Sequence, residues 1–164
     1  MAEGASNPAV EKRVMVAIDE TDSSYYALIW VLENLKESIA DSPLFLFTAL
    51  PPPSSYTPGL ARSYFHVASS TELVYTLQEN DKKVRCGLLE KAKDICAERG
   101  VAAISITEVG DPGTTICDTV EKLNINLLVL GDRGLGRIKR LTQESSCNYC
   151  VQNAKCPVLV VKKP

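Results

Sequence analysis

The run GDRGLGRIKRLTQESS holds the residues of this chain that are best suited to bind an anion. Gly131, Gly134 and Gly136 follow an apolar segment, and glycines let a backbone approach a ligand closely. Ser145 and Ser146 stand where a helix is predicted to begin, and helix starts offer free N–H groups and a partial positive charge. These residues predict a phosphate-binding loop. A flexible turn before a serine-capped helix is the alternative that the loop residues alone leave open.

The spacing of these glycines differs from that of two well-known nucleotide loops. Nothing in the chain matches the pattern G-x-x-x-x-G-K-[ST], and the glycines run G-x-x-G-x-G after the fourth predicted strand. No general base, nucleophile or metal-ligand set stands out, so the sequence predicts neither an enzyme nor a metal site. His66 is isolated in a proline- and serine-rich stretch, and we interpret it as a surface residue.

Cys147 and Cys150 form a C-x-x-C pair at the same predicted helix start. Such a pair can be a redox couple with a lowered thiol pKa. The other interpretation is a pair of buried thiols, since cysteines are common in cores and no second cysteine pair completes a zinc site.

Apolar segments alternate with helical ones along the chain. The predicted strands are 13–19, 43–50, 101–109, 126–131 and 156–163, and the predicted helices lie within 20–40, 71–98, 111–125 and 145–154. The strands are continuously apolar, which is typical of a parallel sheet with helices on both faces. In such folds ligands bind beyond the carboxyl ends of the strands, where Asp19, Leu50, Gly110 and Gly131 are found. Pro51–Ser70 is a long irregular connection.

The composition of the 164 residues is that of one globular domain, with 45% hydrophobic and 23% charged residues. Residues 1–11 are predicted to be a disordered lead-in and residues 12–164 the domain. The net charge of −2 argues against a general nucleic-acid binder. The sequence shows no signal peptide and no apolar run long enough to span a membrane, so a cytoplasmic location, with the nucleus as a further possibility, is expected.

Four segments in order resemble the universal stress protein family, in its plant single-domain type. They are VMVAIDETDSSYYAL, GDPGTTICDTVEKL, NLLVLGDRGLGRIKR and NYCVQNAKCPVLVVK, and the resemblance covers residues 13–162. It implies a three-layer sandwich around a five-stranded parallel sheet of order 3-2-1-4-5, the adenine-nucleotide-binding fold of that family. It also implies binding of ATP or AMP, with Mg²⁺ as a companion of ATP, and a homodimer formed through the last strand, Pro157 to Lys162.

The resemblance further implies which residues meet the nucleotide. Ala17 and Ile18 would line the base, Asp19 would lie near the adenosine, and Ala49 would meet the adenine edge. The residues that would face the ribose and phosphates are Gly131, Arg133, Gly134, Gly136, Ser145 and Ser146. From the residues alone, Asp19 could equally be the cap of the first helix.

Glu144 is the one departure from the family motif, which runs Gly-x-x-Gly, nine residues, then Gly-Ser or Gly-Thr. Gly131, Gly134 and Ser145 match it, but Glu144 takes the place of the third glycine. A carboxylate near a polyphosphate costs roughly 4 kcal/mol at about 4 Å and an effective dielectric of 20. We therefore expect ATP to suffer more than AMP, unless Glu144 turns to solvent.

The leading interpretation is a stress-responsive regulatory protein that binds an adenine nucleotide. Two alternatives stay open: a member without ATP binding that acts as a chaperone-like or thiol-dependent interaction module, and a slow ATP hydrolase. The sequence identifies neither the stress nor the protein partners.

Overall fold

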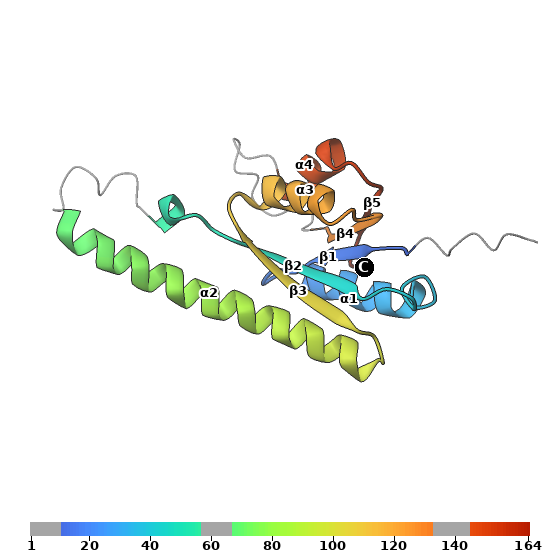
Figure 1. Ribbon diagram of the computed structural model, residues 1–164. Coiled ribbons are helices and arrows are strands. Elements are labelled where there is room, and N and C mark those ends of the chain that lie inside the picture. The colour runs from blue at the N-terminus through green and yellow to red at the C-terminus, as the bar shows by residue number, and fades with distance from the viewer. Residues whose placement is uncertain (1–10, 57–66, 133–144) are drawn as a thin grey trace, which may run out of the picture.

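The computed structural model describes residues 11–56, 67–132 and 145–164 as a parallel sheet wrapped by helices (Figure 1). The five strands follow the order β3-β2-β1-β4-β5, and all neighbouring pairs are parallel. Their bounds are β1 Val14–Ala17, β2 Leu44–Leu50, β3 Ala103–Val109, β4 Leu127–Gly131 and β5 Val158–Val161. The predicted fold class and strand order are confirmed. The chain reverses direction across the sheet between β1 and β4, which makes their carboxyl ends the switch point.

Helices cover both faces of the sheet (Figure 1). They are α1 Asp22–Asn34, α2 Val67–Glu98, α3 Pro112–Lys122 and α4 Ser146–Asn153, with a short 3₁₀ turn, η1, at Pro53–Tyr56. Successive strand residues point to opposite faces. Val14 and Val16 therefore pack in the core beneath α1 and α2, whereas Met15 packs in the core that holds Ile116 of α3 and Cys150 of α4.

The helix starts follow from their capping residues. Thr21 is the N-cap of α1, and its side chain accepts a hydrogen bond from the Ser24 amide. Asp111 is the N-cap of α3, and its side chain accepts a hydrogen bond from the Thr114 amide. Pro112 follows in the first helical turn. Both helices begin as predicted. α1 ends at Asn34, however, so the rest of the predicted segment up to residue 40 is not helical, and the segment 51–70 contains η1 and the first turn of α2 instead of being irregular throughout.

The two edge strands are less covered than the central ones. Ile104 and Val109 of β3 are 45% and 56% exposed, so the expectation that both faces of every strand are covered is wrong for β3. At the other edge, three of the four residues of β5 are half-buried. Pairing of β5 with β5 of a second copy would give hydrogen-bond partners to the backbone groups on its open side. The homodimer stays a prediction. Among the described helices, none is long and apolar enough to cross a membrane.

Candidate functional site

A cleft lies at the carboxyl ends of β1, β2 and β4, where the sequence placed the site. It is bounded by strand ends, by the first turns of α1, α3 and α4 and by one side chain of α2. Its lining residues are Ala17, Ile18, Asp19, Ser24, Phe47, Thr48, Ala49, Arg85, Pro112, Ile116, Leu130, Gly131, Ser146 and Cys147. The structure thus brings together the predicted residues from β1, β2, β4 and α4. Arg133, Gly134, Gly136 and Glu144 lie outside the described residues.

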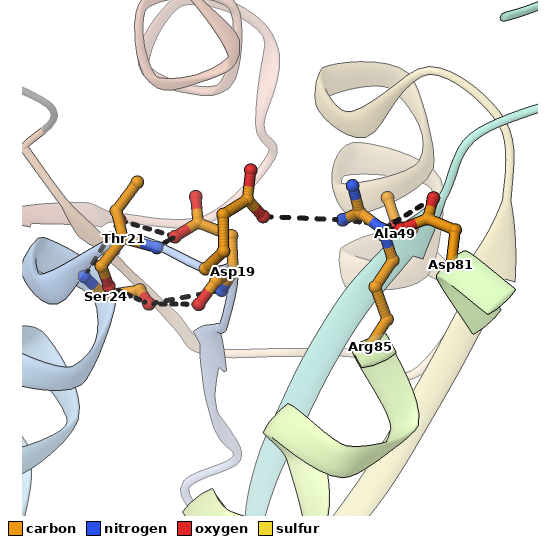
Figure 2. A network of polar contacts seen from close by, with 7 residues as sticks. Asp19, Thr21, Ser24, Ala49, Asp81 and Arg85 are labelled. Carbon is orange, nitrogen blue, oxygen red and sulfur yellow. Dashed lines mark hydrogen bonds and ion pairs between the residues drawn. The ribbon is translucent and has the colours of Figure 1, made fainter. Parts of the chain in front are cut away.

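Asp19 organises the turn that joins β1 to α1 (Figure 2). Its Oδ1 accepts hydrogen bonds from the Thr21 amide, at 2.8 Å, and from the Thr21 hydroxyl. The Ser24 hydroxyl donates to the carbonyls of Asp19 and Thr21, at 3.1 and 3.0 Å. Asp19 therefore supports the capping residue Thr21 and is not itself the cap of α1. Its half-buried carboxylate also raises the pKa of nearby Tyr25, although burial is the larger cause.

Arg85 reaches from α2 to the end of β2 (Figure 2). Its Nε lies 3.2 Å from both carboxylate oxygens of Asp81, one helical turn away. Its Nη1 donates to the Ala49 carbonyl at 3.1 Å and lies 4.0 Å from Glu20 Oε2. The Arg85 side chain is only 18% exposed, so these contacts hold the guanidinium in the wall of the cleft.

The Ala49 backbone faces the ligand side of the sheet because of strand alternation. The Phe47 carbonyl points toward β1 and accepts a hydrogen bond from the Ile18 amide. The Leu50 carbonyl points toward β3 and accepts a hydrogen bond from the Gly110 amide. Groups two residues apart point the same way along a strand, so the Ala49 N–H and C=O point past the end of β1. Ala49 therefore presents a backbone donor and acceptor at the switch point of the sheet.

The first turn of α4 closes the opposite wall. Ser145 is its N-cap, and its Oγ accepts from the Asn148 amide at 3.1 Å. Ser146 lines the cleft, whereas Ser145 is exposed and does not line it. The chain leaves the cleft at Gly131 and returns at Ser146. A helix start at this point offers N–H donors to an anion.

A second hollow lies at the opposite, amino-terminal ends of β2 and β3. It is lined in part by Lys36, Asp41, Pro43 and Val101, and its volume of about 390 Å³ exceeds the 70 Å³ of the cleft. The smaller cleft is nevertheless the better candidate site, because ligands of parallel sheets bind at the carboxyl ends of the strands and because its wall, unlike that of the larger hollow, contains the start of a helix.

The thiols near the cleft differ in their surroundings. Cys150 is fully buried, and its burial raises the pKa of its thiol strongly, with Cys117 and Cys147 adding to the rise. Cys147 is half-buried at the start of α4 and lines the cleft. A redox couple needs an accessible thiolate, so the environment of Cys150 does not favour the redox interpretation of this pair, which stays a prediction.

We expect thiol labelling of the native protein to separate these cysteines. Burial raises the pKa of Cys96 from 9.0 to about 11 and leaves its side chain inaccessible. At pH 8 a rise of two pKa units alone lowers the thiolate fraction about 100-fold. N-ethylmaleimide should therefore modify Cys147, which lines the cleft, much faster than the inaccessible Cys96 and Cys150, as read by peptide mass spectrometry. Equal rates in the folded protein would contradict this description of the thiols.

Sequence reasoning missed several residues that line the cleft. Thr48 is 1% exposed, and its hydroxyl has no hydrogen-bond partner in the described part of the chain. Arg85 was also missed, because it is distant in sequence from the glycine loop that begins at Gly131 and from every predicted strand end. The spacing of Asp81 and Arg85, four residues apart on a predicted helix, was the available signal for a held guanidinium.

The fold is that of a doubly wound α/β protein with a cleft at its switch point. The family model described as "Universal stress protein family" matches residues 11–162, and the chain belongs to this family. A universal stress protein A-like protein of Arabidopsis thaliana is 32% identical over 59% of this chain and 55% of its own length. Universal stress protein YxiE of Bacillus subtilis is 29% identical over 92% of this chain and 98% of its own.

Solved structures of family members share the fold. A universal stress protein family protein from Arabidopsis thaliana, with AMP bound, superposes with a TM-score of 0.65 at 24% identity, covering 93% of this chain and 92% of its own. Other structures of the family hold cAMP and dAMP. These similar proteins bind adenine nucleotides in one shared architecture.

Proposed function

We propose that the cleft binds an adenine nucleotide. The observation that carries the proposal is the meeting of the Ala49 backbone, the Asp19 turn and the start of α4 at the switch point of the sheet. A backbone donor and acceptor can pair with the edge of a base, a carboxylate can accept hydrogen bonds from a ribose, and the N–H groups of a helix start can bind an anion. The adenine nucleotides in similar structures support the same ligand class.

The three groups suggest one placement of the nucleotide. The base would lie against Ala17 and Ile18, with its polar edge at the Ala49 backbone. The Asp19 carboxylate, already an acceptor for Thr21, has lone pairs that can accept from the ribose hydroxyls. The phosphate would lie between Gly131 and Ser146, at the first turn of α4, where a helix start offers N–H donors to an anion. By the family motif, Arg133, Gly134, Gly136 and Ser145 would complete the phosphate end.

We propose that AMP is a better ligand than ATP, because Glu144 stands where the family motif has glycine. A carboxylate at this position costs ATP, with its longer anionic chain, more than AMP. We expect calorimetric titrations of the native protein, one with AMP and one with ATP in the presence of Mg²⁺, to give ATP a dissociation constant at least about tenfold higher than that of AMP. Glu144→Gly should remove that difference and leave AMP binding unchanged. Equal, tight ATP binding by both proteins would contradict the role of Glu144, whereas no binding of either nucleotide would contradict the proposed function.

The proposed biological role is that of a stress-responsive regulator in the cytoplasm, whose state depends on bound nucleotide. The polar contacts of Asp19, Ser24 and Arg85 in the described cleft join side chains to one another and to the backbone, and they form no nucleophile–base pair, which favours binding over catalysis. Among the described residues, no group of His, Cys, Asp and Glu side chains could hold a metal ion.

A further inference from the structure

Arg85 changes what the base end of the cleft offers to a ligand. A carbonyl oxygen has two lone pairs, and Arg85 Nη1 uses one of those on Ala49. The other lone pair remains for a ligand. The guanidinium lines the cleft and has five N–H groups, of which the contacts to Asp81 and to the Ala49 carbonyl use Nε–H and one N–H of Nη1, so it has further donors to offer a ligand.

The two kinds of purine edge have opposite hydrogen-bonding order. A 6-amino purine presents a donor at position 6 and an acceptor at position 1, and a 6-oxo purine presents an acceptor at position 6 and a donor at position 1. The C=O and N–H of Ala49 match the first order. The guanidinium of Arg85 together with the Ala49 carbonyl supplies a donor next to an acceptor, which matches the second.

We propose that Arg85 is a specificity-determining residue that lets the cleft accept 6-oxo as well as 6-amino purine nucleotides. This inference rests on the proposed function and extends its ligand class from adenine nucleotides to purine 5′-nucleotides. Without Arg85, a 6-oxo group would face the Ala49 carbonyl, with two acceptors in contact and no donor between them. With Arg85, the oxygen has a charged donor, and such hydrogen bonds are roughly twice as strong as neutral ones.

Asp81 and Glu20 act on the ligand through Arg85. Asp81 fixes the guanidinium from one side at 3.2 Å, and Glu20 approaches it at 4.0 Å from the turn after β1. Figure 2 shows the guanidinium held between Asp81 and the Ala49 carbonyl. A guanidinium held by several partners loses little freedom when a ligand binds, so its donors are pre-organised. Asp81 is therefore a positioning residue in this proposal.

The test compares AMP with inosine 5′-monophosphate (IMP), which carries a 6-oxo group in place of the 6-amino group. Calorimetry should give the native protein dissociation constants for the two nucleotides within about threefold of each other. Arg85→Met should weaken IMP binding at least about tenfold relative to AMP. Asp81→Asn should also weaken IMP binding relative to AMP binding, but by a smaller factor than Arg85→Met. Arg99→Met is the matched control, since Arg99 pairs with Glu33 outside the cleft, and its ratio should equal that of the native protein.

Two failures are distinguishable. If AMP binds but the IMP-to-AMP ratio is the same in the native protein, Arg85→Met and Asp81→Asn, the inference is overturned and the proposed function stands. If the native protein binds neither nucleotide, both are overturned. Should Arg85→Met fail to fold, as judged by circular dichroism, the ratio for Asp81→Asn decides alone.

Discussion

Replacing Gly131 with alanine should destabilise the protein by about 3 kcal/mol. A Cβ on Gly131 would lie 2.4 Å from the Ser23 carbonyl oxygen and 2.8 Å from the Ser24 amide nitrogen. These are backbone atoms, and the Ser24 hydroxyl bonds to Asp19 and Thr21 hold them in place. The end of β4 or the start of α1 must therefore move, and overpacking of this kind costs about 1–3 kcal/mol or more. Urea unfolding followed by circular dichroism measures the change.

Gly87→Ala is the matched control for this prediction. Gly87 lies on the exposed side of α2, and a Cβ there would meet nothing within 4 Å. Alanine in a helix is better than glycine by about 0.8–1 kcal/mol, so this variant should be more stable than the native protein. A Gly131→Ala variant within about 0.5 kcal/mol of the native protein would show that the contact between β4 and α1 is looser than described.

Asp19→Ala should lower the affinity for AMP at least about tenfold. The carboxylate holds the Thr21 amide and hydroxyl, so its removal loosens the turn that forms one wall of the cleft. In the proposed placement it also removes the acceptor for the ribose. Hydrogen bonds to a charged group contribute about 1.5–3 kcal/mol, which corresponds to at least about a tenfold change in binding. Calorimetric titration with AMP measures the effect.

Asp22→Ala controls for the charge removed near the start of α1. The Asp22 side chain is 91% exposed and lies 3.7 Å from Lys163 Nζ, outside the lining of the cleft. The Asp22→Ala variant also loses one carboxylate, three residues further along the chain than Asp19. It should keep its affinity for AMP within about twofold of the native value. A loss of affinity as large as that of Asp19→Ala would indicate a general effect of charge instead of a contact with the ligand.

The sequence was sufficient for the architecture because local signals agreed with the global fold. Continuous apolar strands between helical segments predicted a parallel sheet, and Thr21 and Asp111 begin their helices as capping residues should. The ends of elements were less predictable. α1 stops at Asn34 although Leu35 and Ile39 continue the apolar spacing, because these side chains pack into the same core from a turn.

Only part of the site could be predicted from local pattern. Asp19 and Gly131 could be predicted because strand ends meet at the switch point of a doubly wound sheet, whereas Ala17 and Ala49 followed from the resemblance to the family. Arg85 was not, because its role comes from the packing of a long helix against β2, 36 residues away in sequence. The positions of Arg133, Gly134, Gly136 and Glu144 stay predictions of the family motif.

The most direct test of the central claim is a titration of the isotopically labelled protein with AMP, followed by two-dimensional amide NMR. Binding at the switch point predicts that the largest shifts occur at the amides of Ala49, Gly131 and Ser146. Amides at the opposite end of the sheet, such as Asp41 and Val101 in the larger hollow, should stay unchanged. Shifts concentrated at Asp41 and Val101, or no shifts at millimolar AMP, would contradict an adenine-nucleotide site at the carboxyl ends of β1, β2 and β4.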